Sequence, residues 1–336
     1  MTQHTITVSG CGGGHHYSAD STESLLEAGL RAGFGFPSAC RNGNCLRCQG
    51  TLLKGSVQLR NGQTIQAGEA AAAQVLYCVA YAQEPCEINV PDITAPGQLP
   101  VIEAACQITD ITPLNHDVSR VMLKLPAGKA VQWYAGQYLE LLLPQGPSAF
   151  SIANARSGDG RDLELHVRHT ADNPSSLEVM QHLRDNPMVR ARLPGGERWI
   201  DESLPDRPVW FICGSTGFAP AKAMIEYLLT RHFPHAIYLY WGARTAADIY
   251  LPELPEAWAS AGKIHYVPVL SETTDDRYRT GLVHEAALAD MTDPAQAECH
   301  VGGSPVMAWA VFDALHAAGV PADNIHSDVF DYAPRP

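Results

Sequence analysis

Three cysteines lie within nine residues in the stretch CRNGNCLRC, residues 40–48, and this spacing limits what the N-terminal part of the chain can fold into. Thiols this close together suit a zinc site, a disulfide or an iron–sulfur cluster. The N-terminal sequence has no signal-peptide pattern and no run of about 18 apolar residues is present, so we expect a cytoplasmic protein without a membrane span. In that reducing setting most of the nine cysteines should be free thiols or metal ligands, which disfavours the disulfide.

The order of the cysteines separates the two metal alternatives. Cys40, Cys45 and Cys48 follow the pattern C-x4-C-x2-C, and Cys78 lies downstream. Plant-type [2Fe–2S] clusters use this ligand pattern, whereas cysteine zinc sites usually need a second C-x2-C pair or a group of histidines, neither of which accompanies this loop. Gly43 lets the loop turn tightly and point backbone N–H groups at sulfur. We predict a [2Fe–2S] cluster held by these four thiolates, with zinc as the lesser alternative.

The five other cysteines lack ligand spacing. Cys86 lies in the strand-like stretch CEINV soon after Cys78, and we expect it to be a buried structural residue. Small thiols are common in protein cores. The other four are also expected to be buried core residues; they are Cys11, Cys106, Cys213 and Cys299.

A length of 336 residues exceeds what one core normally contains, so several domains are expected. Residues 1–93 combine short strands with a helix, which indicates a small α+β unit. For that helix Asp20 is the expected N-cap, with Glu23 three residues later, and Gly33 is the expected stop. The segment PDITAPGQLP contains three prolines and indicates a linker, which we place at residues 94–103.

The remaining two thirds of the chain change pattern near residue 204. Residues 104–203 carry several short β-patterned runs and one helical stretch, which predicts an antiparallel β-barrel. Residues 204–336 alternate strands and helices from the apolar strand VWFIC onward, which predicts a doubly wound parallel sheet. The predicted fold class is therefore multi-domain, α+β and α/β. A net charge of −13 without any basic run argues against a nucleic-acid partner.

Two of these parts resemble known families. Residues 8–90 resemble a plant-type ferredoxin domain of β-grasp fold, with CRNGNCLRC and VLYC in the expected order. Residues 134–155 resemble the flavin-binding barrel of the ferredoxin-NADP reductase superfamily, which has a GQY strand and an R-x-Y/F-S strand. The residues that match are Gly136, Gln137, Tyr138, Phe150 and Ser151. The resemblance implies bound FAD, with Phe150 packed on the flavin and Ser151 at its hydride-accepting edge.

The chain departs from that superfamily in three places. Ser148 stands where the family has an arginine that pairs with the flavin pyrophosphate. Such a charged hydrogen bond contributes about 1.5 to 3 kcal/mol, so its loss weakens binding by roughly one to two orders of magnitude. The glycine and Ser/Thr that usually open the phosphate-facing helix are missing, and Ser175 and Ser176 remain as helix N-terminal donors. Gly302 replaces a cysteine near the nicotinamide, which is expected to affect the rate more than binding.

The C-terminal part is similar to the nucleotide-binding domain of the same superfamily. CGSTGFAP follows a buried strand and opens a helix, so its backbone donors suit a pyrophosphate. YWGAR and GGSPVM then follow in the family's order. The residues that this assigns to the nucleotide are Gly214, Thr216, Gly217, Arg244 and Gly303. Asp248 would repel a 2′-phosphate, so NADH is expected, with NADPH as the alternative. For Arg244 the alternative is an ordinary surface charge.

The segment HSDVFDYA resembles the family's C-terminal S-D-x-F segment, which implies that Phe330 lies beside the flavin, with a simple docking anchor as the alternative. The three parts follow in the order found in oxygenase reductases and in the glucoseen reductases of deoxysugar synthesis. The resemblance implies an oxidoreductase that passes electrons from NADH through FAD to the cluster and on, singly, to an oxygenase or deoxysugar dehydratase. The alternative is a non-catalytic ferredoxin-type electron carrier or assembly protein with a degenerate flavin site.

Overall fold

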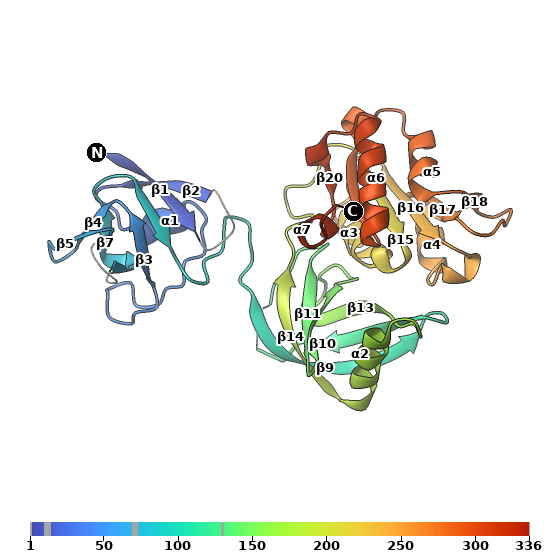
Figure 1. Cartoon of the computed structure of the whole chain (residues 1–336), viewed down its shortest axis with the longest axis horizontal. Helices are drawn as coiled ribbons and strands as arrows, with labels where there is room; N and C mark the ends of the chain where they lie inside the picture. The colour runs from blue at the N-terminus through green and yellow to red at the C-terminus, as the bar shows by residue number, and fades with distance from the viewer. Residues whose placement is uncertain (1, 10–14, 69–72, 129–130, 336) are drawn as a thin grey trace. The chain divides into compact units, whose positions relative to one another are not determined.

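The computed structural model describes residues 2–9, 15–68, 73–128 and 131–335, and its course is drawn in Figure 1. The chain divides into two compact units, Met1–Pro100 and Val101–Pro336. None of the helices in the described ranges is long and apolar enough to cross a membrane.

The N-terminal unit contains a five-stranded and a three-stranded sheet. The larger sheet has the order β2 (His15–Asp20), β1 (Gln3–Ser9), β8 (Cys86–Asn89), β3 (Gln49–Lys54) and β6 (Gln74–Leu76). The smaller sheet has the order β5 (Thr64–Gln66), β4 (Ser56–Leu59) and β7 (Ala80–Ala82). Strand β1 pairs antiparallel with β2 and parallel with β8, and helix α1 (Leu25–Arg31) buries Leu25 and Leu26 in the same core. The predicted β-grasp fold is confirmed.

Helix α1 starts at the second of two successive capping motifs, whereas the sequence pattern predicts the first. Its N-cap is Ser24, whose hydroxyl accepts from the N–H of Glu27 (3.2 Å), while the Glu27 carboxylate accepts from the N–H of Ser24 (3.3 Å). The predicted cap, Asp20, instead closes a turn by accepting from the N–H of Thr22 (2.9 Å). The predicted stop is correct, because Gly33 follows the helix at φ +89°.

The first half of the second unit is a six-stranded antiparallel sheet. Its order is β12 (Gly146–Ser151), β11 (Tyr138–Leu143), β14 (Met188–Gly195), β9 (Ile102–Pro113), β10 (Val118–Lys124) and β13 (Asp162–Arg168). The two edges meet at a bridge between Ile152 and Leu165, which curls the sheet into the predicted barrel. Helix α2 (Pro174–Asp185) contributes three buried side chains to the barrel core, those of Val179, Met180 and Leu183.

The second half of this unit is a six-stranded parallel sheet. Its order is β18 (Arg279–Thr280), β17 (His265–Leu270), β16 (Ile237–Ala243), β15 (Val209–Gly214), β19 (Glu298–Gly302) and β20 (Ile325–His326). The helices are α3 (Phe218–Thr230), α4 (Glu253–Ser260), α5 (Val283–Asp290), α6 (Pro305–Ala317) and α7 (Val329–Tyr332). Phe211 of β15 packs in one core with α3, whereas its neighbour Ile212 packs in another with α5 and α6. Helices therefore cover both faces, as predicted for a doubly wound sheet (Figure 1).

Four of the five cysteines predicted to be core residues are buried, namely Cys86, Cys106, Cys213 and Cys299. Burial raises the pKa of both Cys86 and Cys106 to about 11, so neither thiol ionises readily near neutral pH. Cys11 lies outside the described residues.

Candidate functional site

The cysteine loop is exposed between α1 and β3. The N–H of Cys45 donates to the Sγ of Cys40 (3.3 Å), and the N–H of Cys40 donates to the Sγ of Cys45 (3.4 Å). The backbone N–H of Asn42, followed by the Cys45 thiol, lowers the pKa of Cys40 to about 6. Gly43 makes the predicted turn at φ +88°, in the left-handed region. The loop backbone thus favours the thiolate form that a metal ligand requires.

Cys48 and Cys78 form a second, buried pair. Burial first, and then the hydrogen bond with Cys48, raises the pKa of Cys78 to about 11, while the N–H of Gly43 acts in the opposite sense. Among the described residues, no three His, Cys, Asp or Glu side chains surround one point as a single metal ion would need. Two pairs of thiols fit two iron atoms with two thiolates each better than they fit one zinc ion.

Strands β11 and β12 carry the residues predicted to meet a flavin. They pair antiparallel, with Tyr138 opposite Ser151 and Leu139 opposite Phe150. Phe150 is half-buried and packs against the barrel core. The Tyr138 ring lies so close to the backbone of Gly195 that a Cβ there would be 2.4 Å from it. The pairing therefore brings the GQY strand and the F-S strand side by side.

Gln137 is buried and supports the turn that precedes β11. Its side-chain oxygen accepts from the N–H of Tyr134 (2.8 Å), and its side-chain nitrogen donates to the carbonyl of Gly196 (3.2 Å). Both ends of the amide are therefore bonded within the protein. Gln137 fixes the turn that contains Gly136, so its influence on a ligand is indirect.

Some of the hydrogen-bonding groups at the start of α2 are already bonded to other groups of the protein. The Ser176 hydroxyl donates to the carbonyl of Asn173 (2.7 Å) and accepts from the N–H of Thr170 (3.2 Å). The Asn173 side chain in turn accepts from the N–H of Ser176 (3.3 Å). Ser175 is exposed. Of the two predicted donors, the side chain of Ser175 is thus the more available to a phosphate.

Two arginines from separate elements affect the pKa of Asp172, which lies just before α2. The pKa of Asp172 is lowered by the hydroxyl of Thr170 and also by the charges of Arg168 and Arg244. Arg168 is paired with Asp117 (2.7 Å), whereas Arg244 is exposed just beyond β16 and has no ion pair among the described residues. The predicted nucleotide residue Arg244 therefore lies within electrostatic reach of the barrel helix.

The two glycine turns meet where the order of the parallel sheet reverses. Gly214 ends β15, the short helix Ser215–Gly217 follows, and Gly302 ends β19 beside it. A Cβ on Gly217 would lie 2.2 Å from the carbonyl carbon of Gly302, so only glycine allows this approach. Strands β16 to β18 lie on one side of β15, and β19 and β20 on the other. Open α/β sheets bind their ligands at the carboxyl ends of strands at such a switch point.

The turns of the barrel and of the parallel sheet line one small crevice. Its walls include Gly136 from the barrel and Gly217, Gly302 and Asp328 from the nucleotide half. The predicted residues Thr216 and Gly303 directly adjoin these glycines in the chain. The crevice therefore unites residues that the sequence separates by more than a hundred positions.

Asp328 is a site residue that the sequence motifs do not single out. Burial, followed by the charge of Asp331, raises the pKa of Asp328 to about 7. Its Oδ1 has no hydrogen-bond partner among the described residues. A carboxyl group that titrates near neutrality in a crevice is suited to hold and transfer a proton. The available signal was the S-D-x-F segment itself, which contains this acid beside the aromatic.

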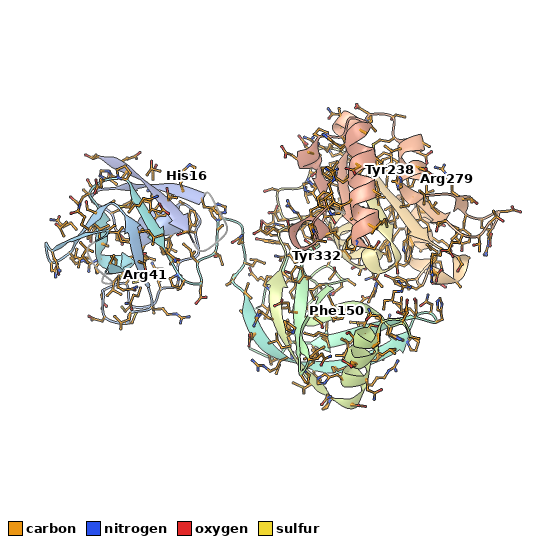
Figure 2. All side chains as sticks on the ribbon, viewed as in Figure 1. His16, Arg41, Phe150, Tyr238, Arg279 and Tyr332 are labelled. Atoms are coloured by element: carbon orange, nitrogen blue, oxygen red, sulfur yellow. The ribbon has the colours of Figure 1, made fainter. Side chains whose placement is uncertain are left out.

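The two aromatic residues of α7 have different surroundings. Phe330 packs against Trp309 (ring centroids 4.5 Å apart) and Phe312 (5.3 Å), in the core that α6 helps to form. Tyr332 is 69% exposed, and the partial desolvation of its hydroxyl, followed by the charge of Asp328, raises its pKa. Figure 2 labels Tyr332 on the C-terminal helix and Phe150 on the barrel. The environment of Phe330 favours the docking-anchor alternative, and the exposed aromatic near Asp328 is Tyr332.

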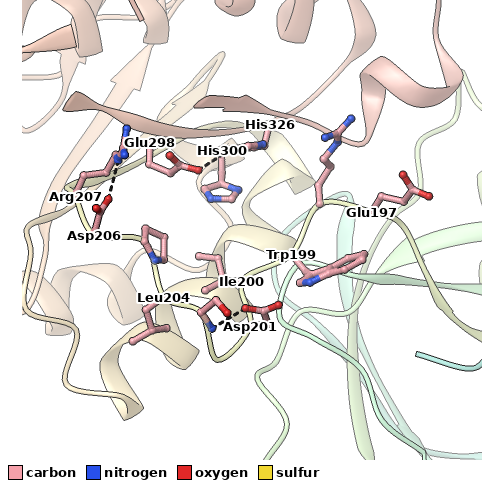
Figure 3. Close-up of a pocket in the computed structure, with 13 residues that line it drawn as sticks. Glu197, Trp199, Ile200, Asp201, Leu204, Asp206, Arg207, Glu298, His300 and His326 are labelled. Carbon is pink, nitrogen blue, oxygen red and sulfur yellow. Dashed lines mark hydrogen bonds and ion pairs between the residues drawn. The ribbon is translucent and has the colours of Figure 1, made fainter. Parts of the chain in front are cut away.

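A larger polar cavity of about 520 Å³ lies between residues 197–207 and strands β19 and β20 (Figure 3). In it His326 is hydrogen-bonded to Glu298 (2.6 Å). Burial, and then His326, lowers the pKa of His300 to about 3, and neither ring nitrogen of His300 has a partner among the described residues. No residue predicted from the sequence lines this cavity in the part of the chain that the structure describes.

Comparison with known proteins covers both units. Residues 8–83 match the 2Fe-2S iron-sulfur cluster binding domain family, and residues 211–313 match the oxidoreductase NAD-binding domain family. Terephthalate 1,2-dioxygenase reductase component 2 of Comamonas sp is 31% identical, with 93% of each chain covered. The CDP-6-deoxy-L-threo-D-glycero-4-hexulose-3-dehydrase reductase of Yersinia pestis is 28% identical over 94% of this chain and 95% of its own. Among solved structures, an Amycolatopsis cytochrome P450 reductase is 28% identical, with a TM-score of 0.65 over 97% of this chain and 98% of that one.

Proposed function

This chain belongs to the family of reductases that join a plant-type [2Fe–2S] ferredoxin domain to a ferredoxin-NADP reductase module, and we propose that it is an NADH-dependent electron-transfer component. Electrons pass from NADH through FAD to the cluster, and then singly to a separate redox protein. The crevice shared by Gly136, Gly217 and Gly302 carries this proposal, because it sets the nucleotide turn against the flavin-predicted turn.

The chain's own groups have distinct tasks in this proposal. When bound, FAD supplies the exchange between a hydride and single electrons, and the cluster supplies one-electron transport. The backbone donors of the turn Gly214–Gly217 hold the nucleotide pyrophosphate at the start of α3. Phe150 and Ser151 would flank the flavin, and Asp328 would hold a proton in the crevice that Gly136 and Gly217 also line. The thiolates of the four ligand cysteines would hold the two irons.

NADH is the proposed donor rather than NADPH. Arg244 is the positive charge available to a 2′-phosphate, but it acts on the carboxylate of Asp172. Asp248, four residues beyond Arg244, keeps its carboxylate fixed by accepting from the N–H of Thr245 (2.9 Å). These two acids oppose the approach of a second phosphate.

The proposed acceptor is an oxygenase or a deoxysugar dehydratase. The names of the two curated relatives refer to a dioxygenase and to a sugar dehydrase, which supports this choice. The cysteine loop supports a protein acceptor, because Cys40 and Cys45 lie exposed at the outer edge of the ligand set. Electrons can therefore leave the cluster without entering a buried substrate pocket.

An anaerobic visible spectrum tests the proposal. We expect flavin and cluster absorption together, and NADH should bleach both. In Cys48→Ser the cluster absorption should disappear, whereas in the control Cys86→Ser, which alters a buried cysteine outside the ligand set, it should remain. Cluster absorption without flavin, even after FAD is added, would instead favour the non-catalytic electron carrier, which the substitutions at Ser148 and Gly302 suggest.

A further inference from the structure

We propose that the rim of the cysteine loop docks the electron acceptor, and that the acceptor presents an acidic face with an apolar pocket around its redox centre. We define the docking rim as Arg41, Leu46, Arg47 and Arg60. This inference rests on the proposed function, because it concerns the protein that takes electrons from the cluster. Beyond the proposed function, it states which charge and which apolar contact this chain recognises on that protein.

The rim is positively charged in a chain that is strongly negative. Residues 28–68 contain no Asp or Glu but five basic residues, whereas the whole chain has a net charge of −13. Two of the five are neutralised, because Arg31 pairs with Glu23 and Lys54 pairs with Glu87. The other three are the arginines of the docking rim, and none of them has an ion pair with a described residue.

These three arginines are placed around the ligand cysteines. Arg41 follows Cys40 directly, and Arg47 precedes Cys48; both arginines are exposed. Figure 2 labels Arg41 on the N-terminal unit. Arg60 directly follows β4, and its backbone N–H donates to the carbonyl of Val79 (2.9 Å), the residue after Cys78. Positive charge therefore reaches the ligand set from two separate segments of the chain.

Leu46 adds an apolar side chain to this rim, between Cys45 and Arg47 in the chain. It is 60% exposed although it lies between the ligands Cys45 and Cys48. Its φ of +58° is in the left-handed region, where a leucine is strained and a glycine is not. An exposed leucine loses the stabilisation that burial would give, and glycine would adopt this backbone conformation without strain. Strain of this kind collects at binding sites, so we infer that Leu46 is an anchor for the acceptor.

The charge pattern also orients the acceptor. An acidic protein is repelled by the net negative charge of the chain and attracted at the docking rim, so it arrives with its redox centre facing the cluster. A basic protein would be attracted to many other parts of the surface. An acidic acceptor face therefore fits the observed distribution of charge.

Electron transfer from the pre-reduced full-length protein tests the charge argument. The cluster is reduced with dithionite, excess reductant is removed, and electron transfer to cytochrome b5, an acidic acceptor, or to cytochrome c, a basic one, is followed by stopped flow. Transfer to cytochrome b5 should slow as salt rises from about 50 to about 500 mM. Arg60→Gln and Arg47→Gln should each slow it about threefold to tenfold at low salt. The control Lys54→Gln removes the same charge from an ion pair outside the rim and should change it by less than about twofold.

Leu46→Gly separates a docking role from a structural one. The variant should raise the thermal midpoint of the N-terminal unit, because glycine suits φ +58°, while weakening the apparent affinity for cytochrome b5 about tenfold. Leu53→Ala removes another half-exposed leucine of the same unit and should leave transfer unchanged. Unchanged transfer in Leu46→Gly, an equal effect of Arg60→Gln and Lys54→Gln, or transfer to cytochrome b5 that speeds up as salt rises would overturn the proposal. Bleaching of the cluster by NADH is recorded separately, so a failure of the proposed function shows there and not in the dithionite experiment.

Discussion

Replacement of Lys222 by methionine probes the polar contact that joins the barrel to the nucleotide half. Lys222 is only 5% exposed, and its Nζ donates to the carbonyl of Ala153 (3.0 Å) and to Glu164 (3.0 Å). It also pairs with Glu226 one turn further along α3 (2.8 Å). Methionine keeps most of the side-chain volume and removes the charge, so the experiment measures the electrostatic contribution.

The expected loss of stability follows from the carboxylate that is left behind. The side chain of Glu164 is 13% exposed, and without Lys222 its remaining partner is His166 (2.8 Å). Removing one member of a buried ion pair costs about 3–5 kcal/mol. Because His166 still donates to Glu164, we expect the lower end, about 3 kcal/mol. For a unit of this size that corresponds to a fall of about 6–12 °C in Tm.

The penalty should depend on pH in a defined direction. Burial alone would raise the pKa of Glu164, but the His166 hydrogen bond and the charge of Lys222 together hold it below its usual value. In the native protein this group therefore stabilises the fold above the unfolded pKa of about 4.3, and the contribution is lost as pH falls through the lower folded pKa. In Lys222→Met the folded pKa rises, so acid relieves the buried charge. The difference from wild type should be largest at pH 8 and smaller at pH 5.

Urea unfolding followed by far-UV circular dichroism at both pH values measures this difference. Lys124→Met is the control, because Lys124 pairs with Asp162 (3.2 Å) where both side chains are at least a third exposed. That pair should contribute less than about 1 kcal/mol at either pH. A cost for Lys222→Met no larger than the control, or one that grows as the pH is lowered, would refute the reasoning.

Three further predictions concern the site. Ser148→Arg should restore a pyrophosphate contact and tighten FAD binding roughly 10- to 100-fold in a fluorescence titration; an unchanged Kd would contradict the phosphate assignment. Asp328→Asn should be more stable than wild type at pH 8 and similar near pH 4 in urea unfolding, because the folded pKa of about 7 makes the native protein lose stability as pH rises from about 4 to about 7. Equal stability at pH 8 would argue against that buried acid. Gly217→Ala places a methyl group against Gly302, so it should abolish bleaching by NADH while dithionite still reduces the cluster; normal NADH bleaching would place the nucleotide elsewhere.

Local patterns allowed parts of this structure to be predicted. The ligand loop around Cys40 and the turn at Gly217 depend on a few neighbouring residues whose backbone geometry is restricted, so their motifs carry the information. The start of α1 was misplaced because two S/T/D-x-x-E patterns follow each other, and only packing of Leu25 selects Ser24 over Asp20. When the same capping motif occurs twice in succession, the local sequence alone does not show which copy starts the helix.

Contacts between distant segments could not be predicted in the same way. The bond between Lys222 and Glu164 joins residues 58 positions apart, and neither residue belongs to a motif. The positions of Phe330 and Tyr332 depend on which face of a four-residue helix meets α6. Both outcomes are set by tertiary packing, which periodicity in one segment does not reveal.

Helix α3 connects the two turns of the proposed active site. Ser151 ends β12, and the chain continues to Ala153, whose carbonyl is held by Lys222, and to Ala155, whose N–H donates to Glu226 (3.2 Å). Lys222 and Glu226 lie one turn apart on α3, which begins immediately after Gly217. The strand predicted to flank the flavin and the turn predicted to bind the nucleotide are therefore both attached to α3. Because these bonds belong to the protein alone, they hold the two predicted cofactor-binding segments together without any contribution from a bound cofactor.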